Sequence, residues 1–335
     1  MTTTGRSVRH RRTTGRGDRR APSRIAAGAG LALALAACVE LPPPRTTPAP
    51  PGRVTQHVVV VSIDGLRADA IERFDAETLL RLARDGAHTL DARTILPAKT
   101  LPSHTSMLTG VPPSVHGVTW NSLLGDRGAA GGDPQEDGDP PDSLGVPTVF
   151  TLAHAAGFST AAFFSKAKFG FLRTAGGLDF SSAPRSTWTP WGAQRTSEDA
   201  AWYIRRRRPN LVFVHVGEPD YAGHTIGWMS AVYGENVRIA DRAVRRVREA
   251  ADDAYGAGNY TLLVTADHGG HGRTHGADTL SDVRIPWIVA GRGVRAGTTI
   301  GARVNTTDTA ATVLWLLGVP VPAAWTGRPV TEAYE

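Results

Sequence analysis

The sequence predicts an α/β fold in which helices cover a mainly parallel central sheet, and three features support this class. From Val54 onward, short runs of apolar and β-branched residues alternate with segments of helical periodicity, which is the pattern of a parallel sheet covered by helices. Several of the runs are apolar along their whole length, as expected for strands buried on both faces. The 335 residues and the hydrophobic fraction of 41% provide ample material for one large core.

Five segments have the composition of buried strands: residues 58–63, 159–164, 211–216, 261–266 and 287–290. The first reads VVVVSI and the third reads LVFVHV, so both are almost continuously apolar. Strands with one solvated face would instead alternate between apolar and polar residues, so these segments are predicted to lie in the centre of a sheet.

Two segments have the spacing of helices. Leu79, Leu80 and Leu82 precede Gly86, a residue that suits the end of a helix. A second set recurs at steps of three and four residues and predicts a helix with one buried face: Val237, Ala240, Val244, Val247 and Ala251. Residues 125–145 are rich in Gly, Pro and Asp, which predicts a surface loop.

The net charge of +6 comes from the first part of the chain. Residues 1–37 contain eight arginines against the single acid Asp18, which leaves 29 basic and 30 acidic residues from Cys38 onward. The predicted folded part is therefore almost neutral. The sequence indicates no nucleic-acid-binding surface.

The N-terminus predicts export and a lipid anchor. An arginine-rich stretch is followed by 13 small and apolar residues, 25–37, which suits a signal peptide but is short of the roughly 20 residues that span a bilayer. The sequence Leu35-Ala36-Ala37-Cys38 resembles the lipobox of bacterial lipoproteins, so Cys38 is the predicted lipidation site. An ordinary secretory signal is the alternative.

These features divide the chain into three parts. Residues 1–37 are predicted to be a lipoprotein signal peptide, 38–53 a proline-rich tether, and 54–335 the folded domain. We expect the protein to be lipid-anchored in a bacterial cell envelope, in the periplasm or on the outer face of a membrane. Cys38 is the only cysteine, so a disulfide within the chain is excluded.

Acidic and histidine side chains follow several of the predicted strands. They occur in the segments 62–65 (SIDG), 217–224 (GEPDYAGH) and 266–270 (ADHGG), and a fourth segment, 99–104 (KTLPSH), supplies a hydroxyl group. In open α/β sheets, ligands bind beyond the carboxyl ends of the strands. Carboxylates and imidazoles are suitable ligands for zinc or manganese, and the number present suffices for two divalent ions.

In this order, the segments resemble the alkaline phosphatase superfamily, and most closely its nucleotide pyrophosphatase/phosphodiesterase (type I phosphodiesterase) branch. The resemblance covers residues 57–332. Its most specific parts are VSIDG at 61–65, PAKTLPSHTSMLTG at 97–110, EPDYAGH at 218–224, TADHGG at 265–270 and the closing stretch 308–318. It implies an alkaline-phosphatase-like fold and a phosphohydrolase.

The resemblance also implies a site with two zinc ions, in which manganese could replace zinc. It assigns one ion to Asp64, Thr100, Asp267 and His268, and the other to Asp220 and His224. A third ligand of the second ion would lie downstream of the Asp-His pair. His275 is favoured for this position, and His271 is the nearer competitor.

Thr100 would be the catalytic nucleophile, forming a phospho-threonine intermediate. Asn121 follows it by 21 residues, the spacing at which the phosphodiesterase branch places an asparagine that binds a non-bridging phosphoryl oxygen. The backbone N–H after Thr100 would donate to another of these oxygens. The implied substrates are phosphodiester or pyrophosphate bonds of nucleotides or related small esters.

Two lysines support an alternative activity. Ser165-Lys166-Ala167-Lys168 follows a predicted strand and resembles the Lys-x-Lys element of phosphonoacetate hydrolase and of some phosphomonoesterases. Lys166 and Lys168 are therefore candidate substrate-binding residues, unless both are simply solvated. The alternatives are a phosphomonoesterase, a phosphonate hydrolase, or a non-catalytic lipoprotein that binds phosphorylated ligands.

Overall fold

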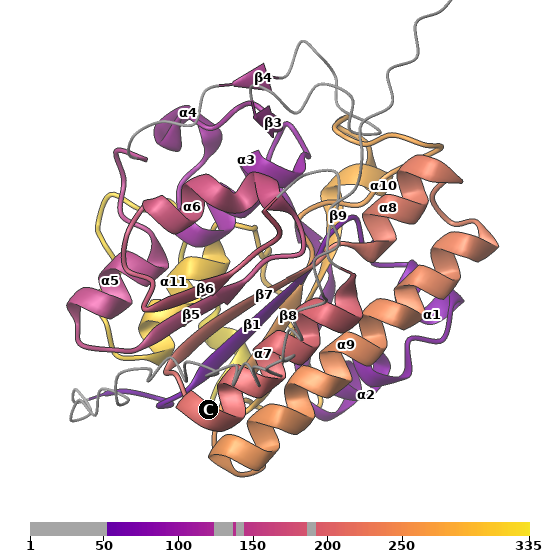
Figure 1. The fold of residues 1–335 in the computed structure, drawn as a ribbon. Coiled ribbons are helices and arrows are strands. Elements are labelled where there is room, and N and C mark those ends of the chain that lie inside the picture. The colour runs from indigo at the N-terminus through magenta and orange to yellow at the C-terminus, as the bar shows by residue number, and fades with distance from the viewer. Residues whose placement is uncertain (1–51, 124–136, 139–143, 186–191) are drawn as a thin grey trace, which may run out of the picture. The chain divides into compact units, whose positions relative to one another are not determined.

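The computed structural model describes residues 52–123, 137–138, 144–185 and 192–335, which contain a large mixed sheet with helices on both faces (Figure 1). The strand order in this sheet is β10-β2-β9-β8-β1-β7-β5-β6. Its strands are β1 (Val58–Ile63), β2 (Ala87–Arg93), β5 (Thr160–Phe163), β6 (Phe180–Ser182), β7 (Leu211–Val216), β8 (Thr261–Thr265), β9 (Arg284–Gly291) and β10 (Thr298–Thr299). A separate short pair joins β3 (Ser122–Leu123) to β4 (Asp137–Gly138).

The sheet is mainly parallel, which confirms the predicted fold class. β1 lies between β7 and β8 and is parallel to both, while β9 is antiparallel to its two neighbours, β8 and β2. Every residue of β1 and of β7 is buried, as their continuous apolarity predicts.

Helices form a layer on each face of the sheet. On one face, α9 (Ala231–Tyr255) packs against α7 (Ala193–Arg207) and α2 (Glu77–Asp85); on the other, α11 (Asp308–Leu316) packs against α3 (Thr100–Thr109) and α5 (Val149–Ala155) (Figure 1). The shorter helices are α1 (Ala70–Arg73), α4 (Pro113–His116), α6 (Gly170–Thr174), α8 (Glu218–Thr225) and α10 (Leu280–Val283), with 3-10 turns η2 (Ala167–Phe169) and η3 (Thr331–Ala333).

Both predicted helices are confirmed. The N–H of Gly86 bonds to Leu82 O (3.0 Å) and ends α2 where the sequence placed its cap. In α9, the predicted apolar positions are all buried, and the hydroxyl of Ser230 caps the first turn by accepting from the N–H of Tyr233.

The predicted signal peptide, Cys38 and all but the last two residues of the tether lie outside the described residues. The same holds for 125–136 and 139–143 of the predicted loop, whose residues 137–138 form β4. Among the residues that the structure does describe, no helix combines the length and apolarity needed to cross a membrane.

Candidate active site

The polar residues singled out in the sequence gather where the central strands end. Asp64 follows β1, Asp220 lies in α8 directly after β7, and Asp267 with His268 follows β8. Because β7, β1 and β8 are parallel neighbours, their carboxyl ends lie side by side. Thr100 joins them as the first residue of α3. All five side chains are buried.

Gly65 allows the end of β1 to approach α8 closely. Its φ is +71°, and a Cβ at this position would lie 2.9 Å from Asp220 Cα. Its carbonyl accepts hydrogen bonds from Trp228 Nε1 (3.0 Å) and Tyr233 Oη (2.8 Å), and its N–H donates to Asp267 Oδ1 (3.1 Å). Gly65, which directly follows Asp64, is therefore in close contact with Asp220 and hydrogen-bonded to Asp267.

Two of the aspartates share a lysine. Lys166 Nζ donates to Asp64 Oδ2 (2.7 Å) and to Asp220 Oδ2 (2.6 Å). His215 Nε2 also lies 2.9 Å from Asp64 Oδ2. Burial lowers the pKa of Lys166, but the charges of Asp220 and Asp64 raise it by more, so it lies above its usual value. Lys166 is thus a charged ammonium group between two carboxylates.

Each of the three aspartates has a second oxygen with no donor. In Asp267, Oδ1 accepts from the N–H groups of Gly65 and His268 (3.1 and 2.9 Å). Its Oδ2 lies 3.3 Å from His104 Nδ1, but that nitrogen makes its shorter bond, 2.8 Å, to Thr100 O. The aspartate oxygens that are buried without a hydrogen bond are Asp64 Oδ1, Asp220 Oδ1 and Asp267 Oδ2.

Three histidines direct Nε2 toward these oxygens. Their Nδ1 atoms bond to backbone carbonyls: His224 to Arg273 O (3.1 Å), His268 to Gly269 O (2.8 Å) and His275 to Ala98 O (2.8 Å). A carbonyl can only accept, so Nδ1 carries a proton in each ring, and Nε2 is the nitrogen whose lone pair is available to a metal ion.

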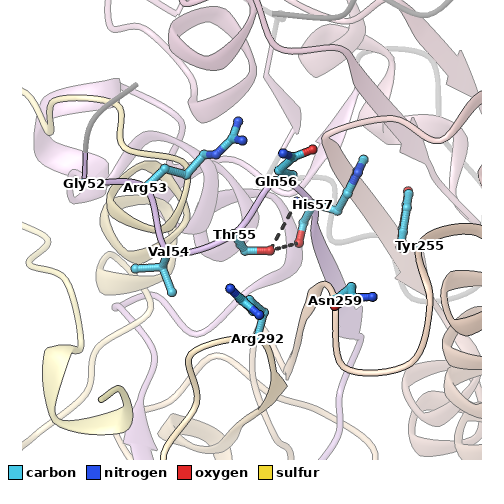
Figure 2. A pocket seen from close by; sticks show the side chains of 9 residues that line it. All are labelled: Gly52, Arg53, Val54, Thr55, Gln56, His57, Tyr255, Asn259 and Arg292. Atoms are coloured by element: carbon cyan, nitrogen blue, oxygen red, sulfur yellow. Dashed lines mark hydrogen bonds between the residues drawn. The ribbon is translucent and has the colours of Figure 1, made fainter. Parts of the chain in front are cut away.

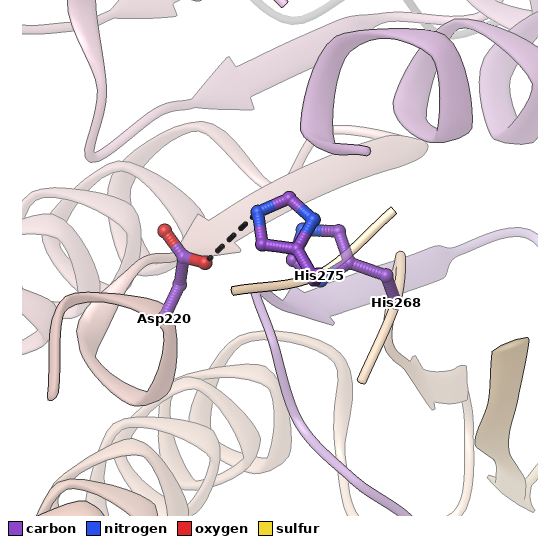
Figure 3. A group of neighbouring side chains, drawn as sticks. All are labelled: Asp220, His268 and His275. Atoms are coloured by element: carbon purple, nitrogen blue, oxygen red, sulfur yellow. Dashed lines mark ion pairs between the residues drawn. The ribbon is translucent and has the colours of Figure 1, made fainter. Parts of the chain in front are cut away.

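His268 Nε2 lies 3.4 Å from Asp64 Oδ1 and 3.3 Å from Asp267 Oδ2. His275 Nε2 lies 3.7 Å from Asp220 Oδ1, and its ring stacks on that of His268 with centroids 3.7 Å apart (Figure 3). His224 Nε2 lies close to the same atoms, at 3.3 Å from Asp220 Oδ1 and 3.1 Å from His275 Nε2.

This donor set fits divalent cations. A buried carboxylate oxygen without a hydrogen bond carries a large desolvation cost, and here three such oxygens face the Nε2 atoms of imidazole rings. A cation held between oxygen and nitrogen satisfies both. The candidate ligand atoms form two overlapping groups, Asp64–Asp267–His268 and Asp220–His268–His275, each with its atoms within 4.8 Å of one another.

The structure places His275, and not His271, in the second group. His271 Nδ1 bonds to Asp282 Oδ1 (2.7 Å), and the His271 side chain is 45% exposed. The Asp282 carboxylate also accepts from the N–H of Ala277 (3.0 Å). Asp282 therefore holds the loop that carries His275 on both sides of this residue.

Thr100 presents its hydroxyl to the first group, with Oγ1 3.4 Å from His268 Nε2. Asn121 lies beside it, and Asn121 Oδ1 accepts from the N–H of Leu101 (3.0 Å) and from Lys168 Nζ (3.2 Å). The N–H that follows Thr100, expected to face a phosphoryl oxygen, here orients Asn121. The Asn121 amide NH2 makes no hydrogen bond within the described part of the chain and so is available as a donor.

The two lysines of the predicted Lys-x-Lys element have different surroundings. Lys166 contacts carboxylates, whereas Lys168 bonds to the side chain and the backbone carbonyl of Asn121 (3.2 and 3.4 Å). Burial, followed by the positive charge of Lys166, lowers the pKa of Lys168 to about 8. Lys168, rather than Lys166, is the lysine placed next to the predicted phosphoryl-binding asparagine.

His215 was not identified from the sequence. It is fully buried, lies next to Ser62 in the register of β7 on β1, and bonds through Nδ1 to Ser165 Oγ (2.8 Å) as well as through Nε2 to Asp64. Burial lowers the pKa of His215 to about 4, so the ring is neutral. The available signal was a histidine inside an otherwise apolar strand, just before the acidic segment.

Comparisons with known proteins found a matching family model and distant relatives. A sequence model of the family described as "Type I phosphodiesterase / nucleotide pyrophosphatase" matches residues 58–282. Venom phosphodiesterase 2 of Crotalus adamanteus is 24% identical over 228 residues, which cover 67% of this chain and 28% of the relative. The chain thus spans about a quarter of the length of this relative.

Solved structures with similar folds have low sequence identity. Murine ectonucleotide pyrophosphatase/phosphodiesterase 5, in an inactive form complexed with AMP, has a TM-score of 0.66 at 16% identity, with 84% of this chain and all of that chain covered. Wild-type alkaline phosphatase PafA has a TM-score of 0.66 at 14% identity, with 87% and 100% covered. These likenesses confirm the predicted alkaline-phosphatase-like fold.

Proposed function

This chain belongs to the type I phosphodiesterase/nucleotide pyrophosphatase family, and on that premise we propose that it is a metal-dependent hydrolase of phosphodiester or pyrophosphate bonds in nucleotides or related small esters. The observation that carries the proposal is the arrangement at the carboxyl ends of β1, β7 and β8. Three buried carboxylate oxygens without a hydrogen bond face the Nε2 atoms of imidazole rings there, and the hydroxyl of Thr100 lies against the same histidine that both groups share.

We assign the first ion to Asp64, Thr100, Asp267 and His268, and the second to Asp220, His224 and His275. Zinc is the proposed metal, since mixed carboxylate and imidazole ligands suit it, and manganese is the alternative. When bound, two divalent ions supply charge that acidifies the threonine hydroxyl and stabilises the leaving oxygen.

Thr100 is the proposed nucleophile. Its Oγ1 forms a bond to phosphorus as the bond from phosphorus to the leaving oxygen breaks, which gives a phospho-threonine and an alcohol or phosphate product. Water then attacks the same phosphorus atom, and the Thr100 hydroxyl is regenerated. The NH2 group of Asn121 and the ammonium group of Lys168 are placed to donate to the non-bridging oxygens in both steps.

Three chromogenic esters distinguish the possible substrate classes. Initial rates of the zinc-loaded full-length chain are compared on bis(p-nitrophenyl) phosphate, p-nitrophenyl thymidine 5′-phosphate and p-nitrophenyl phosphate, with Thr100→Ala as the control. We expect the two diesters to be hydrolysed much faster than the monoester, and Thr100→Ala to abolish all turnover. An advantage of the thymidine ester over the simple diester would indicate contacts to the nucleoside.

A phosphomonoesterase is the second candidate, because Lys168 lies next to Asn121 and supplies positive charge for a dianionic phosphoryl group. Lys168→Ala separates the two activities, since it is expected to reduce turnover of p-nitrophenyl phosphate far more than that of the diesters. If the monoester is the best substrate, the chain is a phosphomonoesterase. Failure to bind zinc at all would favour the non-catalytic alternative.

We also propose that the protein is exported and lipid-anchored through Cys38. The lipobox-like sequence that ends at Cys38 supports this proposal. Mass spectrometry of the N-terminal peptide purified from a bacterial host tests it. A diacylglyceryl group on Cys38 at the new N-terminus is expected, whereas cleavage elsewhere without lipid would identify an ordinary secretory signal.

A further inference from the structure

A pocket of about 460 Å³ lies at the amino end of β1, and the proposed reaction does not use it. Its walls are residues 52–57, the end of α9, the turn before β8 and the residue after β9 (Figure 2). Asp64 follows the other end of β1, and a strand of six residues spans about 20 Å. The pocket and the candidate active site are therefore at opposite ends of the sheet.

The pocket is lined by cations without counter-charges. Arg53 and Arg292 both contribute to its walls, and no acidic residue does. Neither guanidinium group makes a hydrogen bond or an ion pair with any residue that the structure describes. Arg53 is half-buried and lies 6.0 Å from the ring centroid of Phe158, its recorded side-chain contact. Burial lowers the pKa of Arg53, which reflects the cost of holding this charge away from water.

The surroundings of His57 show the same excess of positive charge. Burial lowers the pKa of His57, the bond to Pro209 O raises it, and the charges of Arg53 and Arg208 lower it again, for a net decrease. Arg208, like the two lining arginines, has no ion pair within the described ranges. An anion in the pocket would face Arg53 and Arg292, and no carboxylate lines the pocket.

Hydrogen bonds hold two rings and one backbone segment of the pocket walls in place. His57 Nδ1 and Tyr255 Oη both donate to Pro209 O (3.0 and 2.9 Å), and the two rings stack with centroids 4.0 Å apart. Arg292 is fixed through its backbone, because its N–H bonds to Tyr260 O (2.8 Å) and its carbonyl accepts from Thr261 Oγ1 (3.0 Å). Binding would therefore have to order the side chains of Arg53 and Arg292 but not the backbone that carries Arg292.

We propose that this pocket binds the phosphate group of a ligand between Arg53 and Arg292. A guanidinium group presents a planar fork of N–H donors that matches phosphate oxygens. Two such groups balance the charge near −2 of a phosphate monoester, and their N–H donors also match the oxygens of a singly charged phosphodiester such as a lipid headgroup. The volume exceeds that of phosphate alone and leaves room for an attached organic group.

The phosphate can come from a soluble phosphate monoester or from a phospholipid headgroup. The pocket adjoins Gly52, the point at which the 51 preceding residues join the fold. The shared chemistry is a phosphate group, and the experiment separates the two sources.

The experiment compares the full-length chain with Arg53→Ala/Arg292→Ala. Arg173→Ala/Arg303→Ala is the matched control, because it removes two exposed arginines that do not line the pocket. Equilibrium dialysis with radiolabelled inorganic phosphate counts the sites per chain. A second arm measures cosedimentation with phosphatidylcholine vesicles, with and without phosphatidylglycerol. Thermal unfolding verifies that each variant is folded. If the double variant Arg53→Ala/Arg292→Ala does not fold, the single variant Arg292→Gln replaces it.

We expect the pocket variant to bind one phosphate fewer per chain than the control variant, and each single arginine change to weaken that site about tenfold. Loss of this site with unchanged vesicle binding identifies a soluble phosphate ligand. A loss of binding to phosphatidylglycerol vesicles, relative to the control, identifies the headgroup. If the pocket and control variants behave alike in both arms, the proposal is wrong.

Discussion

Replacing Lys166 with methionine should destabilise the metal-free protein far more than the metal-loaded protein. Lys166 Nζ lies 2.7 Å from Asp64 Oδ2 and 2.6 Å from Asp220 Oδ2, and its side chain is only 10% exposed. Methionine fills a similar volume but leaves both buried carboxylates without their shared cation. Removing one partner of a buried ion pair costs about 3–5 kcal/mol. In a protein of this size that corresponds to a decrease of roughly 6–10 °C in Tm.

Bound divalent ions should reduce the destabilisation caused by Lys166→Met. Asp64 and Asp220 are assigned to different ions, so both carboxylates keep a counter-charge when Lys166 is absent. We therefore expect a decrease in Tm of only about 2 °C in saturating zinc, which corresponds to 1 kcal/mol or less. By linkage, the variant should bind metal more tightly than the wild type by about 30-fold or more, since the two destabilisations differ by at least about 2 kcal/mol.

The assay is thermal unfolding in EDTA and in saturating zinc, with chelator competition for the affinities. Lys168→Met is the matched control, because Lys168 contacts Asn121 and no carboxylate, and it should have a small effect in both conditions. Equal destabilisation of Lys166→Met with and without zinc would refute the reasoning, as would unchanged or weaker metal binding.

Three further predictions concern the residues around the candidate ligands. His215→Asn should weaken metal binding about 10–100-fold, because Asp64 Oδ2 loses one of the two groups that orient it, the other being Lys166 Nζ; unchanged affinity by chelator competition would show that His215 is a packing residue. Because Lys168, with a pKa of about 8, binds phosphate only as an ammonium ion, kcat/KM for p-nitrophenyl phosphate should fall as pH rises through about 8. Lys168→Ala should remove this decrease, and a variant with the same pH profile would contradict the assignment. Asp282→Asn should loosen the loop that carries His275 and reduce zinc occupancy from two ions toward one, measured by elemental analysis; full occupancy would exclude this positioning role.

The first of these tests has a matched control in another buried histidine. His116 bonds through Nε2 to Ser106 Oγ (2.9 Å) and contacts no candidate ligand in the described structure. His116→Asn should therefore leave the metal affinity unchanged. A comparable loss in both variants would point to general destabilisation rather than to the orientation of Asp64.

Strand composition explains which parts of the sheet could be predicted. β1 and β7 are continuously apolar because helices cover both faces, and their bounds match the prediction. β2 was missed because it reads AHTLDAR, with polar residues at an irregularity in its pairing with β9. β9 extends from 284 to 291 rather than from 287 to 290, since Arg284 and Gly291 pair at its ends although neither is apolar.

In the candidate site, too, some residues could be predicted from the sequence and others could not. Asp64, Asp220 and Asp267 could be placed together because each follows a strand, and parallel strands end at one edge. The contacts of Lys166 with Asp64 and Asp220 could not be predicted, because they depend on β5 lying next to β7 and on β7 lying next to β1. The spacing of residues along the chain does not determine this strand order. His215 was missed for a related reason, since a single histidine in an apolar strand is usually a core residue.

The central claim, that two divalent ions at this site are needed for phosphodiester hydrolysis, is tested most directly by one titration. Metal-depleted protein receives increasing amounts of zinc, and zinc per chain and the rate on bis(p-nitrophenyl) phosphate are measured in the same samples. We predict that zinc binding saturates at two ions per chain and that the rate rises with the second ion. Full activity at one ion per chain, or in the absence of bound metal, would contradict the account.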